Sequence, residues 1–223
     1  MNKYDVIIIG AGPSGIFCAY ELMRQKPDMK VLMIEKGRSI EKRQCPKRTT
    51  KVCVGCKPCS ITTGFAGAGA FSDGKLSLSP DVGGTLPEIL GYEKAEELIK
   101  EADNIYLKFG ADEKVYGIDD YEAIERIRAK AIRANLKLIE CPIRHLGTEE
   151  GYKIYTRLQE HLLASGVEIK FMTMVQDIII EDGVAKGVVT DKEETYYADE
   201  IVSGIGREGS SWFEGICKNH GIK

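Results

Sequence analysis

Residues 6–15, with the sequence VIIIGAGPSG, constrain the fold of this chain more than any other stretch. The four β-branched apolar residues at its start predict a short buried strand of a parallel sheet. Gly10, Gly12 and Gly15 follow at the spacing G-x-G-x-x-G. Gly10 allows the tight turn out of the strand, Gly12 lets a pyrophosphate approach the backbone, and Gly15 lets the next helix pack on the strand.

Pro13 and Ser14 open the predicted helix, whose apolar residues recur at helical spacing over residues 16–23. Proline suits the first turn because its missing N–H would have no partner within the helix there. The start of such a helix presents N–H groups and the positive end of its dipole to phosphates. We therefore place Pro13 and Ser14 in a phosphate site with the three glycines.

A second apolar run, residues 31–34, ends in Glu35, which lies 20 residues after Gly15. An acidic residue that binds the ribose hydroxyls of a dinucleotide is expected at this position. A carboxylate there would repel a 2′-phosphate, which argues against NADP. A glycine-rich turn without a ligand is the alternative, but strand, glycines, helix, strand and acid in this order favour dinucleotide binding. NAD and FAD both remain open on this motif.

Residues 38–63 form a basic, cysteine-rich stretch without an apolar period, which predicts an ordered loop or a small insertion. It carries Cys45, Cys53, Cys56 and Cys59, and the last three have the spacing C-x-x-C-x-x-C. Four thiolates can saturate a tetrahedral zinc ion or hold an iron–sulfur cluster. The spacing does not separate these two, although the close triple is slightly more typical of a cluster. Free cysteines, or a transient disulfide between close pairs, are the alternatives.

Residues 60–79 are rich in glycine and other small residues, which let the backbone approach a flat ligand and turn N–H groups towards anionic oxygens. The predicted contacts with a flavin ring and a pyrophosphate come from Gly67, Ala68, Gly69 and Gly74. Lys75 is a candidate to lie near the flavin or the substrate, and Asp73 is a candidate orienting carboxylate. Both are equally compatible with an ordinary surface turn.

Composition and charge argue against several classes of protein. The net charge of −3 gives no sign of a nucleic-acid-binding surface. No apolar run approaches the ~20 residues that a membrane span needs. The first residues, MNKYD, lead directly into the predicted strand, so we expect no signal peptide and a cytoplasmic protein. Seven cysteines in such a chain favour metal or redox chemistry over structural disulfides.

The middle of the chain predicts two amphipathic helices and a short strand. The first helix covers residues 93–109, and the second is capped by Asp119 or Asp120. We expect the second helix to pack with an inward face of Tyr121, Ile124, Ile127, Ala131 and Ile132. The short strand is predicted at residues 136–139.

Arg144 and His145 lie close before the next predicted helix. Arg144 could hold a carboxylate and His145 could transfer a proton, which makes both candidate catalytic residues. The plainer interpretation, which we favour, is a helix-entry loop in which Thr148 caps the helix and His145 is merely hydrogen-bonded. The sequence does not identify a catalytic residue beyond these candidates and Lys75.

The C-terminal third predicts a return to the parallel sheet. A helix at residues 150–165 precedes a strand at 167–171. Three antiparallel strands then form a β-meander, with a turn at Glu181, Asp182 and Gly183. Residues 199–206 predict the last parallel strand.

The form GAGPSG, followed by EKG at residues 35–37, resembles the FAD-binding domain of glutathione-reductase-like flavoproteins. Residues 45–84, with the cysteine loop before GFAGAGAFSDGKL, resemble a group of prokaryotic FAD-dependent dehydrogenases of unassigned substrate. This resemblance extends to about Gly209, and it implies FAD and an oxidoreductase. It also implies cofactor contacts for Lys36, for the Val175 backbone at the adenine, and for Gly206, although Gly204 stands where alanine is common.

Together these features predict an α/β fold: a Rossmann-like FAD/NAD(P)-binding domain with a parallel sheet, an antiparallel β-meander and an inserted helical lobe. Residues 1–84 would form the first part of the FAD-binding domain, with the cysteine-rich loop at 45–59. Residues 85–147 would form the inserted lobe, and residues 148–223 the second part with the meander. Resembling flavoproteins are usually longer, so we expect a C-terminally truncated form.

The predicted function is an FAD-dependent oxidoreductase that transfers hydride through flavin to or from a small-molecule substrate or electron donor. The alternatives are a truncated, non-catalytic FAD-binding module and an NAD-dependent dehydrogenase. We expect no nucleic-acid or membrane partner. The cysteine loop would add an iron–sulfur cluster or zinc, either for electron transfer or to brace the loop.

Overall fold

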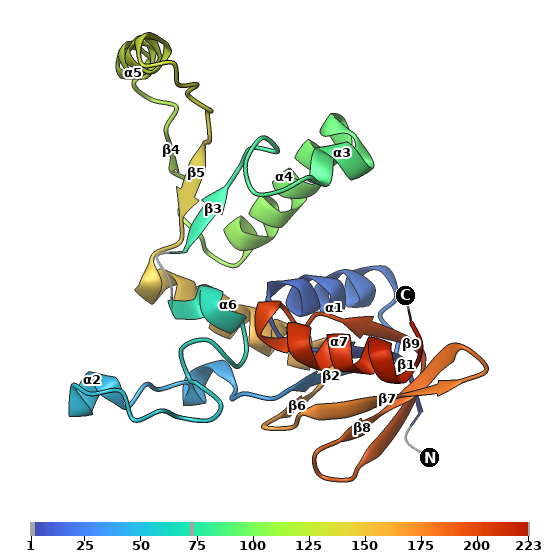
Figure 1. The fold of residues 1–223 in the computed structure, drawn as a ribbon. Helices are drawn as coiled ribbons and strands as arrows, with labels where there is room; N and C mark the ends of the chain where they lie inside the picture. The colour runs from blue at the N-terminus through green and yellow to red at the C-terminus, as the bar shows by residue number, and fades with distance from the viewer. Residues whose placement is uncertain (1–2, 72–73, 223) are drawn as a thin grey trace. The chain divides into compact units, whose positions relative to one another are not determined.

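The computed structural model describes residues 3–71 and 74–222, which form two compact units (Figure 1). The first unit comprises Met1–Phe71 and Tyr155–Lys223, and the second comprises Ser72–Ile154. The fold class is α/β, as predicted. Within the described residues, no helix has both the length and the apolar character to cross a membrane.

A six-stranded sheet in the order β6-β2-β1-β9-β8-β7 forms the centre of the first unit. Its strands are β1 (Lys3–Ile9), β2 (Val31–Glu35), β6 (Glu168–Phe171), β7 (Val175–Glu181), β8 (Val184–Thr190) and β9 (Thr195–Ser203). Strands β6, β2, β1 and β9 pair in parallel in that order, and β9, β8 and β7 pair as an antiparallel meander. The strands predicted at the positions of β1, β2, β6, β7 and β8 are therefore confirmed.

Strand β9 differs from the prediction in one respect, because it is a single strand where the sequence predicts two. Its start at Thr195 pairs antiparallel with β8, and its remainder pairs in parallel with β1 as far as Ser203. Tyr197 takes part in both pairings. One strand thus joins the meander to the nucleotide-binding part of the sheet.

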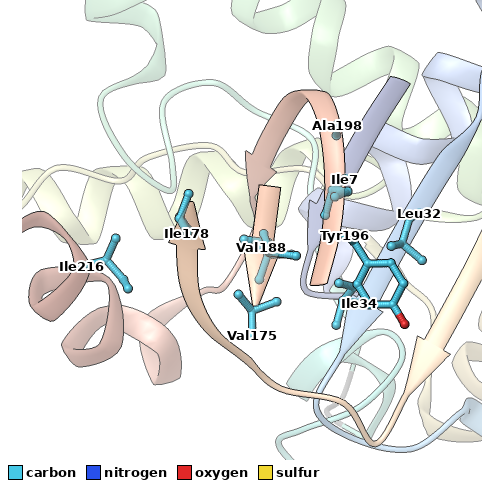
Figure 2. Close-up of a cluster of buried hydrophobic side chains, with 10 residues drawn as sticks. Ile7, Leu32, Ile34, Val175, Ile178, Val188, Tyr196, Ala198 and Ile216 are labelled. Carbon is cyan, nitrogen blue, oxygen red and sulfur yellow. The ribbon is translucent and has the colours of Figure 1, made fainter. Parts of the chain in front are cut away.

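Apolar side chains cover both faces of this sheet. The side chain of Ile8 packs at Gly15 of helix α1 (Pro13–Gln25), so α1 lies on the face that Ile8 presents. Figure 2 shows the neighbouring positions on the opposite face, where Ile216 of α7 (Ser210–Asn219) joins the strand residues. That cluster consists of Ile7, Ile9, Leu32, Ile34, Val175, Ile178, Val188, Tyr196, Ala198 and Ile216. Side chains alternate across a strand, which explains this division.

Short elements complete the first unit, and one long helix belongs partly to each unit because the division falls between Ile154 and Tyr155. The short elements are η1 (Ile40–Lys42), α2 (Lys47–Thr50), η2 (Gly67–Phe71) and η3 (Arg207–Gly209). Helix α6 (Thr148–Ala164) buries Leu158 and Leu162 and ends before Gly166, which has a φ of +94°. Glycine adopts this left-handed conformation without a steric cost, so it ends the helix as predicted.

The second unit is built on an antiparallel sheet in the order β3-β5-β4, with β3 (Lys75–Ser77), β4 (Val115–Tyr116) and β5 (Ile143–His145). Its helices are α3 (Leu86–Leu90), α4 (Tyr92–Lys108) and α5 (Tyr121–Arg133). Helices α4 and α5 confirm the two predicted helices, and Asp120 caps α5 by accepting a hydrogen bond from the Ala123 N–H at 2.9 Å.

Two predictions for this unit are wrong. Residues 136–139 form no strand, because the cross-strand partners of β3 and β4 lie further along, at residues 143–145. The predicted inward face of α5 is not buried: Tyr121, Ile127 and Ile132 are exposed, and no residue of the helix is buried. An amphipathic pattern predicts which side of a helix is apolar, but not what covers it.

Candidate functional site

A cavity of about 490 Å³ opens in the first unit where parallel strands end. Its walls include Gly10 after β1, Glu35 at the end of β2, and Gly204 after β9. The carboxyl ends of these strands meet at one edge of the sheet, where open α/β sheets bind their ligands. This position makes the cavity the candidate functional site.

Gly12 has no structural reason to be glycine other than the cavity that it faces. Its φ of −73° and ψ of 178° are ordinary for any residue. A Cβ built on it would meet nothing within 4 Å. The space above Gly12 therefore lies open to a ligand, and the N-terminus of α1 begins there with Pro13 at its first position. Such a helix start favours a phosphate group.

Gly10 and Gly15, by contrast, are glycines because neighbouring backbone atoms leave no room for a Cβ. A Cβ on Gly15 would lie 2.0 Å from the Gly10 carbonyl oxygen, so α1 could not sit where it does with any other residue there. Gly10 has a φ of +99°, and a Cβ on it would lie 2.7 Å from the Gly204 carbonyl oxygen. Gly15 does not line the cavity, and it shapes the turn through packing, as the motif predicts.

The Glu35 side chain is buried, and both of its carboxylate oxygens accept backbone hydrogen bonds. Oε2 accepts from the Ala11 N–H and Oε1 from the Gly37 N–H, each at 2.8 Å. These bonds tie the end of β2 to the glycine-rich turn after β1. Each carboxylate oxygen can accept more than one hydrogen bond, so Glu35 can also receive a ligand hydroxyl.

Arg43 organises the loop that forms another wall of the cavity. It is 2% exposed, and its guanidinium donates to the carbonyl oxygens of Ser60, Ile61, Phe65 and Gly67 at 2.5–3.0 Å. Burial lowers the pKa of Arg43 to about 10, and the charges of Glu35 and Cys59 act in the opposite direction. The planar guanidinium thus fixes the loop whose residues Thr62–Gly64 line the cavity.

Lys36, Thr63 and Glu208 link three separate segments of the cavity wall. The Glu208 carboxylate lies 2.9 Å from Lys36 Nζ and accepts a 2.8 Å hydrogen bond from the Thr63 hydroxyl. The hydrogen bond from Lys36 is the main cause that lowers the pKa of Glu208 below its usual value. We call these three residues the Glu208 bridge.

The structure brings most of the predicted cofactor residues together around this cavity. Those that line it are Gly10, Gly12, Pro13, Ser14, Glu35, Lys36, Gly67, Ala68, Val175 and Gly206. Gly69 lies in the same unit but faces the Tyr155 hydroxyl instead. Gly74 and Lys75 belong to the second unit, and Asp73 lies outside the described residues.

The candidate catalytic residues all belong to the second unit. Lys75 of β3 pairs across the sheet with His145 of β5, so the structure brings these two residues together. The Arg144 guanidinium is buried and contacts both Asp103 carboxylate oxygens, at 2.5 and 2.7 Å, and the Asp112 carbonyl oxygen at 2.6 Å. These contacts give Arg144 a structural role within the unit. The Asp103 hydrogen bond raises its pKa.

The cysteine-rich loop does not form the predicted metal centre in this structure. Cys45, Cys53, Cys56 and Cys59 are free thiols, and the described residues contain no group of three or more side chains placed to hold a metal ion. Spacing alone favoured a metal, but residues 52–55 of the loop are exposed and have no helix or strand that would turn the thiols inward. The metal part of the prediction is therefore not supported.

Several residues of the site were not predicted as site residues from the sequence. They are Arg43, Thr62, Thr63, Thr173, Met174, Arg207, Glu208 and Trp212. Trp212 lines the cavity and donates its ring N–H to the Gln176 carbonyl oxygen at 2.9 Å. Arg43 and Glu208 act through partners distant in sequence, so no local motif reveals them.

The fold and this cavity are typical of a dinucleotide-binding α/β protein. Comparison with protein families then identifies the family. Residues 5–206 match the family described as DAO, FAD dependent oxidoreductase. The chain belongs to this family. The match agrees with the predicted FAD cofactor and gives no support to an NAD-only dehydrogenase.

Solved structures with a similar fold include three proteins at low sequence identity. L-amino acid deaminase from Proteus vulgaris has a TM-score of 0.56 and 14% identity, covering 100% of this chain and 51% of its own. Glycine oxidase from Bacillus cereus has a TM-score of 0.54 and 17% identity, covering 98% and 58%. THI4 from Thermovibrio ammonificans has a TM-score of 0.52 and 13% identity, covering 99% and 64%. This chain thus spans about half to two thirds of their length.

A sequence relative matches a short segment only. Thiamine thiazole synthase of Coprinopsis cinerea is 52% identical over 33 residues, which are 15% of this chain and 10% of that protein.

Proposed function

We propose that this chain holds FAD in the first-unit cavity and serves a flavin-dependent oxidoreductase that acts on a small-molecule substrate or electron donor. The observation that carries the proposal is Gly12, whose missing side chain leaves open space at the start of α1 inside the cavity. Family membership supports FAD as the dinucleotide.

The residues around the cavity fit the polar parts of FAD. The start of α1 would receive the pyrophosphate, because the first N–H groups of a helix have no partner within it. Glu35 would accept hydrogen bonds from the ribose hydroxyls, and Val175 would contact the adenine through its backbone. Gly67 and Ala68 line the same cavity and would lie along the cofactor.

Bound FAD supplies two-electron chemistry by hydride transfer. The chain's own residues would bind and orient the cofactor, and the Glu208 bridge would hold the segments around it. Lys75 and His145 are the residues that we propose for substrate contact, because they are cross-strand neighbours in the second unit. We also propose a more specific relationship of this chain to glutathione-reductase-like flavoproteins and to prokaryotic FAD-dependent dehydrogenases. This part of the proposal rests on the GAGPSG and cysteine-loop motifs.

The test is anaerobic reduction of the FAD-loaded chain by candidate donors, followed through the visible absorbance of the flavin. NADH and free amino acids are the probes. We expect at least one donor to bleach the protein-bound flavin faster than it bleaches free FAD. FAD that binds but is reduced no faster than free FAD by any donor would contradict the oxidoreductase and leave a binding module.

Gly12→Val is the variant that links the activity to this cavity. Its side chain would enter open space in the cavity, so we expect the fold to persist and FAD binding to fall by about a hundredfold or more. Gly215→Val is the matched control, because a Cβ there also meets nothing within 4 Å but the residue lies outside the cavity wall. Equal FAD binding by the two variants would overturn the assignment of the site.

A further inference from the structure

Trp212 gives the first-unit cavity an aromatic wall whose polar atom is already engaged. The side chain lines the cavity from helix α7. Its ring N–H donates to the Gln176 carbonyl oxygen at 2.9 Å, and an indole has no other hydrogen-bonding group. Trp212 therefore presents apolar aromatic surface to a ligand, which suits a flat ring better than a charged group or a hydroxyl.

Two contacts hold the Trp212 side chain in place. The hydrogen bond to Gln176 ties it to β7, and the side chain also packs against the apolar cluster of the first unit. Ile216, four residues later on the same helix, belongs to that cluster (Figure 2). Residues four positions apart lie on the same face of a helix, so α7 is anchored beside the tryptophan. The ring is thus preorganised, and ordering it when a ligand binds costs little entropy.

A series of connected segments runs along the cavity wall from the start of α1 to Trp212. The glycine-rich turn before α1 donates a backbone hydrogen bond to the Glu35 carboxylate at 2.8 Å. The Thr173 N–H donates to the Glu35 carbonyl oxygen at 3.1 Å. Residues 174 and 175 come next and line the cavity, and Gln176 then accepts the Trp212 N–H. The wall therefore connects the phosphate position, the ribose position and Trp212 in that order.

We propose that Trp212 stacks on the adenine of the bound dinucleotide and so sets the affinity of the cavity for its adenosine end. The inference rests on the proposed function, because the base is that of FAD. Phosphate, ribose and base follow one another in an adenine nucleotide, in the same order as the start of α1, Glu35 and Trp212 in the wall. Stacking uses the flat face of a base, so it is compatible with the contact proposed for the Val175 backbone.

Titration of the full chain with ADP, followed by tryptophan fluorescence, tests this contact first. The chain has one tryptophan, so any change in the signal reports on Trp212. ADP carries the base, the ribose and the phosphates but no flavin, and we expect it to quench the fluorescence saturably. Inorganic pyrophosphate lacks the base, and we expect it to leave the fluorescence unchanged. Equal quenching by the two probes would overturn the stacking contact.

Substitutions at Trp212 measure the contribution of the aromatic face through calorimetric titrations with ADP and with FAD. Trp212→Leu should raise both dissociation constants by about tenfold, within the range that stacking on one base contributes. Trp212→Phe also loses the hydrogen bond to Gln176 but keeps an aromatic face, so it should recover most of the affinity. Phe213→Leu is the matched control, because Phe213 is 37% exposed on the same helix and lies outside the cavity wall. It should leave both dissociation constants unchanged.

The role of Trp212 and the proposed function fail in different ways. If the chain binds FAD but Trp212→Leu binds FAD and ADP as tightly as the wild type does, the role of Trp212 is overturned and the cofactor site stands. Trp212→Phe binding as weakly as Trp212→Leu would also overturn it, because the side chain would then act through its hydrogen bond and not through its aromatic face. A folded wild-type chain that binds neither FAD nor ADP would contradict the proposed function, and the role of Trp212 with it.

Discussion

Different interactions stabilise the two units of this chain. In the first unit, all five residues of β2 are buried, and apolar side chains cover both faces of the sheet. In the second unit, the sheet strands have two or three residues each, the Arg144–Asp103 ion pair is buried, and the apolar face of α5 is open. The comparison teaches that the first unit is stabilised by its apolar core and the second depends on a few specific contacts.

The largest expected effect is on the second unit. Asp103→Asn should destabilise it by about 3–5 kcal/mol, because the buried Arg144 guanidinium loses its counter-charge. Hydrogen exchange of peptides from α4 and β5 should rise sharply, while FAD binding by the first unit persists. Glu97→Gln on the same helix is the control, since its pair with Lys94 is half exposed and contributes little. Equal exchange in the two variants would contradict the comparison.

Gly15→Ala is the corresponding test of the first unit. Its Cβ would lie 2.0 Å from a backbone oxygen, so we expect a cost near the upper end of the roughly 1–3 kcal/mol typical of overpacking. Urea unfolding followed by Trp212 fluorescence measures this unit, because the chain has one tryptophan. Gly204→Ala is the control: its Cβ would lie 3.4 Å from its nearest neighbours, and we expect near-wild-type stability. Two variants of similar stability would rule out close packing as the reason for Gly15.

Arg43→Met should have an intermediate effect that reaches the cavity. The carbonyl oxygens of residues 60–67 would lose a buried donor, at about 1–3 kcal/mol for a group left unsatisfied. We expect weaker FAD binding together with lower stability. Arg43→Lys keeps the charge but lacks the planar set of donors, so it should recover little of the loss. Full recovery by lysine would show that charge alone matters.

Glu208→Gln should have the smallest effect and should depend on pH. Its lowered pKa means that the Glu208 bridge stabilises the fold above the unfolded value of about 4.3 and loses this contribution as the pH falls through the folded pKa. The side chain is half exposed, so solvent screening keeps the effect below about 1 kcal/mol. The difference in unfolding free energy between wild type and variant should vanish on acidification. A difference that persists in acid would contradict the bridge.

The sequence predicted the β1–α1–β2 unit and the part of the cavity wall that this unit supplies, because their signals are local. Apolar runs mark the strands, Gly15 answers a steric demand from Gly10 five residues before it, and Gly12 leaves the start of α1 open to the cavity. The remaining features depend on residues far apart in the chain. Thr63 and Glu208 are 145 positions apart and Asp103 and Arg144 are 41 apart, and neither pair leaves a local pattern.

The apolar side of helix α5 also shows what local sequence can and cannot predict. Its periodicity correctly predicted a helix and its apolar side, since both follow from the local sequence. Burial of that side needs a partner, and periodicity contains no information about the partner. The metal prediction lacks support for a related reason, because C-x-x-C-x-x-C places thiols close in sequence without itself turning them towards one centre, and the described residues contain no group placed to hold a metal ion.

The most direct test of the central claim is a spectroscopic titration of the chain with FAD. We predict that the visible flavin bands sharpen and shift as FAD binds, that the change saturates at one FAD per chain, and that Gly12→Val abolishes it while Gly215→Val does not. A folded wild-type chain that leaves the spectrum of added FAD unchanged would contradict the account.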